Sequence, residues 1–532
     1  MEHIACDVLI LGSGAAGLRA AIAVRQAGLD VVLISKSRSG KSTCTGFSGG
    51  VMAGWQNAGS TAAHLQQTLQ AGRGINQQEL AELFVRDAPV RLRELVEWGI
   101  HSEFKDIYLF SKGRPPLLGQ EIIRCLIAKN RELGTRFIDD LAVIDLIVED
   151  GAAAVNCYVK GSGSWVVVTA CSLVLATGGA AALYLRHDNP NQILGDGHRL
   201  ALEAGARLQD MEFVQFYPLC LAEPGRPPMI VPPNLADCGL LANDSGENIL
   251  EKYEIHERPA AQRARDRLSR ALFQEIRQEG RNVFIDLSNR PEEIWLQDPF
   301  CAAARHILGE RYGAMHRPVR VAPAAHHFMG GVKIDKHAAT SLPGVFAAGE
   351  VTGGLHGANR MGGNALTDTL VFGAIAGNSA AQWAKACHPV NPELLISRLE
   401  EKRVDWMKFG PHPMALHEKL REIMWRDGGI IRNKEGLIRA GEQVRDLQHA
   451  LLQTSKIRSP GQMSDLNPFG TISLCSALKV AALILEASLL RRESRGAHYR
   501  EDFPEQNDKD WKGHLLVQID AKGDKQWTFQ PE

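Results

Sequence analysis

The chain has 532 residues and a mass of 58.2 kDa, with 60 Lys plus Arg and 61 Asp plus Glu, so its formal net charge is -1 at pH 7. This near-neutral charge and a hydrophobic fraction of 45% exclude a nucleic-acid binder with a basic face, a disordered chain and a collagen-like or coiled-coil fibre. At about 150 residues per domain, the length predicts roughly three to four domain-sized pieces.

The first predicted unit is a strand, a glycine turn, a helix and a second strand. CDVLIL at 6–11 is a short apolar run typical of a buried parallel strand, and GSGAAG follows it. LRAAIAVRQAG at 18–28 has apolar residues at helical spacing, and DVVLIS at 30–35 is the second strand. A glycine motif in this context predicts a bound dinucleotide.

Three glycines of this turn have separate expected roles. Gly12 permits the tight turn, Gly14 lets a pyrophosphate approach the backbone, and Gly17 lets the helix pack on the strand. The N-terminus of the helix offers free N–H groups and a positive dipole end to the phosphates.

Later segments alternate strands and helices around a region rich in Pro, Gly and Asn. The predicted elements are helices between 60 and 100 joined near 72–76, strands at 141–148, 153–159, 165–168 and 172–179, a helix at 261–279, a strand at 344–350 and helices over 390–490. The shift in composition over 218–260 predicts that the chain leaves its first domain there, and GVFAAGE at 344–350 predicts its return. The tail after Arg491 is polar, and we expect it to wrap the surface.

The residues after the second strand leave the dinucleotide open between NADP and FAD. The strand ends in Ser35 and Lys36 with no acidic residue for ribose hydroxyls, and Lys36 with Arg38 could read a 2′-phosphate. LATGG at 175–179 and FAAGE at 346–350 both end a strand in small residues that admit a long extended cofactor. These two segments favour FAD.

Cysteine spacing predicts no metal site in this chain. The ten cysteines are scattered, with no CxxC, ferredoxin or zinc-knuckle spacing, so we expect reduced thiols and place any iron–sulfur cluster on a partner. The N-terminus shows no signal peptide, and we find no uninterrupted apolar run of about 18 residues. We therefore expect a cytoplasmic protein, associated with a membrane only through partner subunits.

Motifs in a fixed order over nearly the whole chain carry a family resemblance. They are DVLILGSGAAG at the start, LISKS at 33–37, GDG at 195–197, DMEFVQF at 210–216, RDRLSRA at 265–271, HHFMGG at 326–331, HGANRMGGNAL at 356–366 and RRESRGAHYREDFPE at 491–505. With these motifs the chain resembles the flavoprotein subunit of the succinate dehydrogenase/fumarate reductase family. That family of FAD-dependent oxidoreductases acting on CH–CH bonds also includes L-aspartate oxidase.

The resemblance implies an α/β fold in which a Rossmann-like FAD-binding domain is interrupted by an α+β capping domain and followed by a C-terminal helical domain. The expected bounds are 1–225 and 331–385 for the FAD-binding domain, 226–330 for the capping domain, 386–490 for the helical domain and 491–532 for the tail.

The resemblance also implies a set of FAD contacts. They are Gly12, Gly14, Ala15, Ala16, Gly17, Ser35, Lys36, Ser42, Thr43, Cys44, Thr45, Gly49, Gly50, Ala176, Thr177, Gly178, Asp196, His327, Glu350, Arg360, Ala365 and Leu366. Membrane-bound respiratory members carry a His that bonds covalently to the flavin, and Thr43 stands at the matching position. A hydroxyl cannot make that bond, so we expect noncovalent FAD with a lower potential, which suits reduction better than succinate oxidation.

In this family a hydride passes between flavin N5 and one alkene carbon while an Arg exchanges a proton at the other. The matching motifs place the proton-donating Arg at Arg265, a carboxylate-binding His at His326 and a carboxylate-binding Arg at Arg360. Guanidinium groups suit this work because they bind carboxylates in bidentate geometry.

Four positions of the substrate site depart from the family pattern. Tyr217 stands where the family has a substrate-binding His, and Val231 stands where it has a carboxylate-binding Thr. Pro232 and Leu235 replace the Glu and Arg that relay protons to the catalytic Arg, and neither can carry a proton. The pocket is therefore predicted to be less cationic and more apolar at one end. A small carboxylate substrate with one carboxylate near Arg360 and His326 and a bulkier or less charged far end fits it better than a C4 dicarboxylate.

Three nearby residues could compensate for these losses. Asp237 and Cys238 could rebuild a proton relay, and Arg226 could replace the missing positive charge. The sequence does not decide between these roles and ordinary structural ones.

Three functions are compatible with these motifs. The first is a fumarate reductase- or succinate dehydrogenase-like enzyme that exchanges electrons with an iron–sulfur subunit. The second is an oxidase like L-aspartate oxidase, but such oxidases keep the two motifs lost here. The third is a flavin subunit that mainly transfers electrons within a larger complex, which leaves the retention of Arg265, His326 and Arg360 unexplained. The first is the prediction.

Overall fold

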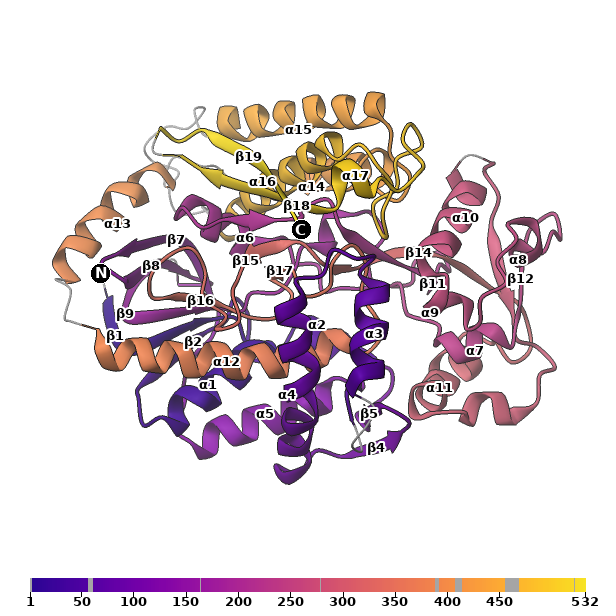
Figure 1. Cartoon of the computed structure of the whole chain (residues 1–532), viewed down its shortest axis with the longest axis horizontal. Helices are drawn as coiled ribbons and strands as arrows, with labels where there is room; N and C mark the ends of the chain where they lie inside the picture. The colour runs from indigo at the N-terminus through magenta and orange to yellow at the C-terminus, as the bar shows by residue number, and fades with distance from the viewer. Residues whose placement is uncertain are drawn as a thin grey trace.

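The computed structural model describes residues 2–55, 61–162, 164–277, 279–387, 392–406, 414–454, 468–520 and 522–532. A seven-stranded sheet in the order β6-β2-β1-β9-β8-β7, with β16 also paired to β9, forms the centre of the first half (Figure 1). Pairs β1–β2, β1–β9, β2–β6 and β9–β16 are parallel, whereas β7–β8 and β8–β9 are antiparallel.

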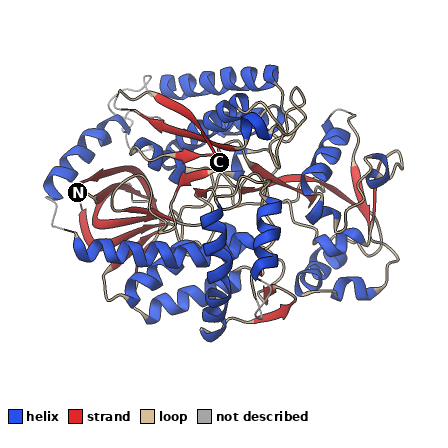
Figure 2. Ribbon diagram, viewed as in Figure 1, coloured by secondary structure: helices blue, strands red, loops and turns tan. Residues whose placement is uncertain are grey.

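The elements of this first segment follow the predicted order. They are β1 Glu2–Leu11, α1 Ala15–Gln26, β2 Val31–Ile34, α2 Cys44–Phe47, β3 Val51–Ala53, α3 Thr61–Ala71, α4 Gln78–Glu97, β4 Ser102–Lys105, β5 Tyr108–Ser111, α5 Gln120–Glu132, β6 Arg136–Ile138, β7 Leu141–Glu149, β8 Ala152–Val159, β9 Trp165–Leu175, η1 Ala181–Leu183, α6 Asp196–Glu203 and β10 Leu208–Gln209. Helices α1, α5 and α12 pack together along one side of the sheet (Figure 2). This cover explains why residues 8–11 of β1 are apolar and fully buried.

The middle of the chain forms a separate mixed unit with its own apolar core. Its elements are β11 Val214–Leu221, α7 Pro233–Asp237, β12 Leu240–Asn243, α8 Ile249–Lys252, α9 Ala260–Arg263, α10 Arg265–Arg277, β13 Val283–Asp286, η2 Glu292–Leu296, α11 Pro299–Ala304, η3 Arg305–Arg311 and β14 Val319–Phe328. Strands β11, β14, β13 and β12 form a four-stranded sheet in that order. In Figure 1 most of this unit lies to one side of the main sheet, joined to it by β11 and β14.

The chain then returns to the first domain and continues into helices. These elements are β15 Gly331–Lys333, β16 Val345–Ala347, β17 Thr352–Gly353, α12 Asn364–Ala386, α13 Pro392–Trp406, α14 Met414–Arg426, α15 Lys434–Thr454, α16 Pro468–Leu490, α17 Asp508–Trp511, β18 Gly513–Ile519 and β19 Lys525–Pro531. Part of the predicted helical stretch, at 388–391, 407–413 and 455–467, lies outside the described residues.

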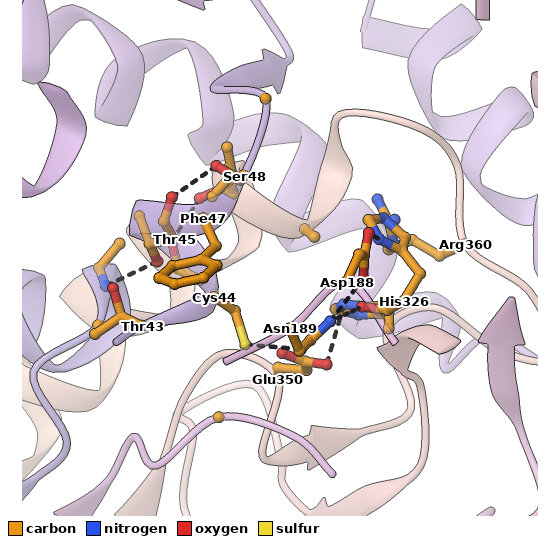
Figure 3. A pocket seen from close by; sticks show the side chains of 18 of the residues that line it. Thr43, Cys44, Thr45, Phe47, Ser48, Asp188, Asn189, His326, Glu350 and Arg360 are labelled. Atoms are coloured by element: carbon orange, nitrogen blue, oxygen red, sulfur yellow. Dashed lines mark hydrogen bonds and ion pairs between the residues drawn. The ribbon is translucent and has the colours of Figure 1, made fainter. Parts of the chain in front are cut away.

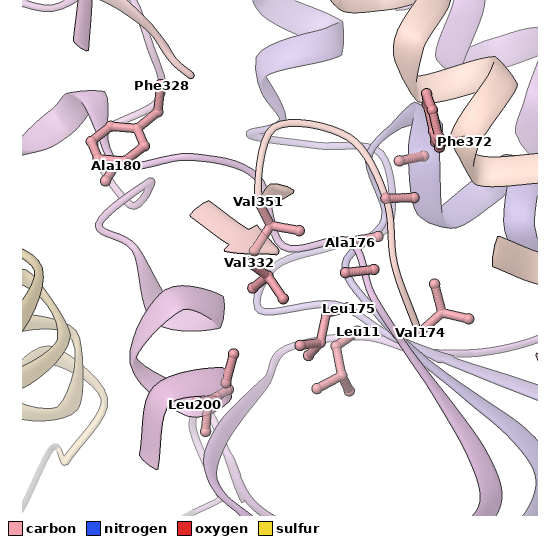
Figure 4. Close-up of a cluster of buried hydrophobic side chains, with 14 of the residues drawn as sticks. Leu11, Val174, Leu175, Ala176, Ala180, Leu200, Phe328, Val332, Val351 and Phe372 are labelled. Atoms are coloured by element: carbon pink, nitrogen blue, oxygen red, sulfur yellow. The ribbon is translucent and has the colours of Figure 1, made fainter. Parts of the chain in front are cut away.

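The apolar core reaches to the carboxyl ends of β1 and β9. Leu11, Leu175 and Val351 are fully buried there, and Figure 4 shows them among neighbouring apolar side chains. In open α/β sheets the carboxyl edge of the strands is where ligands bind. The core therefore supports the edge at which the glycine turn lies.

Helix α16 contains a segment, Phe469–Leu490, that is long and apolar enough to cross a bilayer, with a mean hydropathy of 1.8 in its most apolar window. In this structure 72% of that window is buried inside the protein, as in the core helix of a globular domain. No other helix among the described residues passes the same test.

The expectation that the polar tail wraps the surface is wrong for residues 491–500 and for β18, whereas 501–506, 508–510 and 522–526 are exposed as expected. Strand β18 pairs with β10 inside a five-stranded sheet, and Arg491 and Glu493 are fully buried. The Arg491 guanidinium contacts Glu212 at 2.5 Å and Glu493 at 3.0 Å, and Arg495 contacts Glu493 at 2.7 Å. Paired charges can be buried, and composition alone does not reveal the pairing.

Candidate active site

One large cavity lies where the sheet edge, the loop after β2 and the middle unit meet. Its volume is about 1230 Å³, which exceeds the ~300–1,000 Å³ of a typical small-molecule site and leaves room for a cofactor and a substrate together. All of the sequence-predicted site residues except Gly17 line it.

The three glycines of the turn have the separate roles that the sequence predicts. Gly12 has a φ of +112°, and a Cβ there would lie 2.2 Å from the Ala176 carbonyl oxygen. A Cβ on Gly17 would lie 1.9 Å from the Gly12 carbonyl oxygen, so Gly17 serves the packing of α1 on β1. A Cβ on Gly14 would meet only the Thr45 hydroxyl, at 3.8 Å, so its open side faces the cavity.

A half-buried ion pair at the end of β2 favours FAD over NADP. The Lys36 ammonium lies 2.6 Å from the Asp196 carboxylate. Burial acts to raise the pKa of Asp196, but Lys36, Ser476 and Arg199 together outweigh it and the pKa is lowered. Lys36 is thus engaged by a carboxylate, and Arg38 is exposed outside the cavity wall, so neither is placed to read a 2′-phosphate.

The loop with Thr43 and Cys44 forms one side of the cavity (Figure 3). Thr43 caps α2, its hydroxyl accepting a hydrogen bond from the Gly46 amide at 3.1 Å. The Cys44 thiol lies 2.9 Å from the side-chain oxygen of Asn189, and burial raises the pKa of Cys44 well above its usual value. A thiol in this state is a hydrogen-bond donor rather than a nucleophile.

Five buried polar atoms on the wall lack hydrogen-bond partners in the part of the chain that the structure describes. They are Thr177 Oγ1, Asp196 Oδ1, Glu257 Oε2, His327 Nε2 and Arg360 Nε. Buried polar atoms without partners are rare in native proteins, so a bound polar ligand is expected to satisfy them. Together with the open side of Gly14, they fit an extended cofactor such as FAD.

Glu350 lies between the two ends of the cavity. Its carboxylate accepts a hydrogen bond from the Phe328 amide at 3.0 Å and lies 3.6 Å from His327 Nδ1. Burial raises the pKa of Glu350 to about 7 and lowers that of His327 well below its usual value.

The four residues predicted to act on the substrate converge at the other end. Arg265, at the start of α10, donates to the Arg360 carbonyl at 3.3 Å and lies 5.6 Å from the Tyr217 ring centroid. Arg360 donates to Gln215 at 2.9 Å, and burial lowers its pKa to about 9. The ring of His326 lies 5.7 Å from that of Tyr217.

The Tyr217 hydroxyl is hydrogen-bonded to the backbone. It donates to the Val231 carbonyl at 2.7 Å, and the side chain is buried among the apolar residues of the middle unit. This wall of the cavity therefore offers an aromatic ring where the family pattern has an imidazole and a hydroxyl.

The residues that could have compensated for the lost proton relay and the lost positive charge do not line the cavity. The Asp237 carboxylate accepts from the Ala260 amide at 2.9 Å, and the Cys238 thiol lies 3.4 Å from the Asn234 carbonyl. Arg226 stacks over Tyr312 at 5.8 Å. None of these three described residues lines the cavity, so no proton relay or replacement charge comes from them.

Sequence reasoning missed Asp188 and Asn189, which line the cavity beside His326. The Asp188 carboxylate lies 2.7 Å from His326 Nδ1 (Figure 3). Two polar residues directly before a proline, between the LATGG and GDG motifs, were the available signal.

Comparison with known proteins gives two matching family models. A model described as an FAD binding domain matches residues 7–114 and 104–366, and one described as a fumarate reductase flavoprotein C-terminus matches 417–531.

Individual relatives match along nearly the full length. One subunit of the fumarate reductase (CoM/CoB) of Methanothermobacter marburgensis is 36% identical, with 97% of each chain covered. The L-aspartate oxidase of Streptomyces coelicolor is 31% identical, covering 97% of this chain and 92% of its own. A structure of quinol fumarate reductase from E. coli superimposes with a TM-score of 0.88 at 28% identity, covering 100% of this chain and 97% of that one.

Proposed function

This chain belongs to the family of FAD-dependent oxidoreductases that includes the flavoprotein subunits of fumarate reductase and succinate dehydrogenase, and we propose that it reduces the C=C bond of an enoate with electrons from an iron–sulfur partner subunit. It is an FAD enzyme acting on CH–CH bonds. The convergence of Arg265, His326 and Arg360 at one end of the cavity is the observation that carries the proposal. The methanogen relative is named as one subunit of its fumarate reductase, which supports a multisubunit assembly.

Each of these three side chains has a task, and that of His326 is to bind the substrate carboxylate together with Arg360. Arg360, fixed by Gln215 through a hydrogen bond of 2.9 Å, presents its guanidinium to the substrate carboxylate. Arg265 gives a proton to one alkene carbon, and its burial, which lowers the pKa of its guanidinium, favours that transfer. When bound, FAD supplies the two-electron chemistry at the other carbon. Arg265 is 5% exposed and Arg360 6%, so both charges act away from bulk water.

The apolar wall at Tyr217 sets the proposed substrate class. Its hydroxyl is committed to Val231, and the cation next to its ring, Arg265, is assigned to proton transfer, so it does not replace the missing imidazole. We therefore assign an enoate with one carboxylate and a less charged far end, rather than a C4 dicarboxylate.

We also propose that the protein works in the cytoplasm and reaches a membrane only through partner subunits.

The direct test is anaerobic. The purified protein is reduced with dithionite, and the return of the oxidised flavin band is followed after adding fumarate, crotonate or cinnamate. Reoxidation by a monocarboxylate enoate faster than by fumarate supports the assignment. Reoxidation by fumarate alone refutes the substrate class, and reoxidation by none of the three, with FAD bound, refutes the activity. Oxygen uptake with L-aspartate would instead support the alternative function, an oxidase like L-aspartate oxidase.

Exchanging Tyr217 for histidine is expected to raise the rate with fumarate. A charge-assisted hydrogen bond contributes about 1.5–3 kcal/mol, so kcat/KM for fumarate should rise roughly tenfold or more. Tyr217→Phe is the matched control, because it removes the hydroxyl without adding a cation, and it should leave the fumarate rate unchanged. Equal fumarate rates in Tyr217→His and wild type would show that this wall does not set the preference for a monocarboxylate enoate over fumarate.

FAD is expected to leave the protein completely on acid denaturation. The Thr43 hydroxyl at the position of the covalent attachment is an N-cap and cannot form a carbon–nitrogen bond to the flavin. The measurement is the flavin absorbance of the supernatant and of the precipitated protein. Yellow colour retained by the washed precipitate would mean a covalent link through another residue.

A further inference from the structure

One polar group of the cavity has no role in the proposed reaction. Asp188 follows η1 and lines the cavity, and its side chain is 7% exposed. One carboxylate oxygen lies 2.7 Å from His326 Nδ1, and the other accepts from the Asn189 amide nitrogen at 2.9 Å. The carboxylate is thus fixed at both oxygens.

Asn189 is itself held in one orientation. Its amide oxygen faces the Cys44 thiol at 2.9 Å, while its amide nitrogen donates to Asp188 and to the His326 carbonyl, both at 2.9 Å. A thiol donates and a carbonyl accepts, so the oxygen and nitrogen of Asn189 cannot exchange places without losing these bonds.

We propose that Asp188 is a positioning residue that fixes the tautomer of His326 and thereby makes the uptake of one proton part of substrate binding. This inference rests on the function proposed above, in which His326 meets the substrate carboxylate.

The hydrogen-bond partners of His326 decide which ring nitrogen carries the hydrogen. A carboxylate only accepts, so Asp188 requires that His326 carry a hydrogen on Nδ1. In the neutral ring Nε2 then has a lone pair and no hydrogen. Nε2 is the ring nitrogen left for a ligand, because Nδ1 is engaged and His326 lines the cavity. A substrate carboxylate is also an acceptor, so it binds at Nε2 only after the ring gains a proton.

Burial is the main factor that favours the neutral His326 ring before a substrate arrives. Burial lowers the pKa of His326, and Arg360 and Arg265 act in the same direction, against the opposing effect of Asp188. Of the other titratable neighbours, Tyr217 on β11 is neutral because burial raises its pKa, and His327 is neutral because burial lowers its pKa. An incoming carboxylate adds the negative charge that stabilises the imidazolium.

Removing the charge of Asp188 has a specific expected consequence. In Asp188→Asn the new amide oxygen is needed by Asn189, so the amide nitrogen faces His326 Nδ1 and donates to it. The neutral ring then carries its hydrogen on Nε2 and can bind a carboxylate without taking up a proton.

The test is isothermal titration of the FAD-loaded protein with crotonate and with fumarate, in buffers of different ionisation enthalpy above neutral pH. For wild type we expect uptake of about one proton per carboxylate bound and an affinity that falls about tenfold per pH unit. For Asp188→Asn we expect clearly less uptake and a weaker pH dependence of the affinity, because Glu350 and Arg360, with pKa values of about 7 and about 9, keep their own contributions in both proteins. Asp106→Asn, which removes an exposed carboxylate from the same cavity, is the matched control and should behave as wild type.

The outcomes separate this inference from the proposed function. Enoate binding and reduction by wild type without proton uptake, or equal uptake in wild type and Asp188→Asn, overturns the inference alone. Failure of both probes to bind overturns both. Ring-nitrogen NMR of isotope-labelled histidine gives a second reading without ligand: the His326 hydrogen should lie on Nδ1 in wild type and on Nε2 in Asp188→Asn, and the same tautomer in both overturns the inference.

Discussion

Replacing Arg265 by alanine is expected to leave FAD bound and to slow enoate reduction by about 10²–10⁴-fold, the usual contribution of a positioned general acid. Arg265 lies at the substrate end of the cavity, and its guanidinium faces Tyr217 and the Arg360 carbonyl rather than the glycine turn. The cofactor end should therefore be unaffected. The measurements are the flavin content of the purified variant and its rate of anaerobic reoxidation by the preferred enoate.

A nearby arginine provides the control for this change. Arg263 lines the same cavity two positions earlier, but its side chain is exposed to solvent. Arg263→Ala should keep most of the activity. Full activity in Arg265→Ala, or equal losses in the two variants, would contradict the assignment of Arg265 as the proton donor.

Gly14→Val is expected to give a folded protein without FAD. Gly14 has an extended backbone that any residue can adopt, with φ at -72° and ψ at -180°. Its Cβ would meet no protein atom closer than 3.8 Å, so the new side chain occupies the cavity rather than the core. The measurements are the flavin-to-protein absorbance ratio and the far-ultraviolet circular dichroism.

The contrast with Gly17→Val makes this prediction specific. A Cβ on Gly17 would lie 1.9 Å from the Gly12 carbonyl oxygen, so this substitution should prevent α1 from packing on β1 and yield misfolded protein. A yellow, stoichiometric Gly14→Val protein would contradict the assignment of this turn to the pyrophosphate.

The first domain was predictable because its local signals agree with one another. The apolar run of β1, the glycine turn and the helical spacing of α1 all favour one strand–turn–helix unit, and the structure places them as expected. The family resemblance supplied what local pattern cannot, since residues as far apart as Gly12 and Leu366 meet in one cavity.

Two features could not be derived from the sequence, for different physical reasons. The sequence predicts a polar tail because residues such as Arg491 and Glu493 are charged. Only the fold shows that these two charges pair with each other in the interior. Asp188 belongs to no motif, and its importance arises from a distance of 2.7 Å to a residue 138 positions away.

The pairing of β10 with β18 also bears on the order in which the chain is made. Domains begin to fold from the N-terminus during synthesis, yet β10 at Leu208–Gln209 receives one of its two neighbours only from Gly513–Ile519. Until those last residues leave the ribosome, one edge of β10 has unpaired backbone groups, which makes a nascent chain prone to association. A message cut short before codon 513 would therefore yield a protein with an open sheet edge, even though every residue lining the cofactor cavity had already been translated.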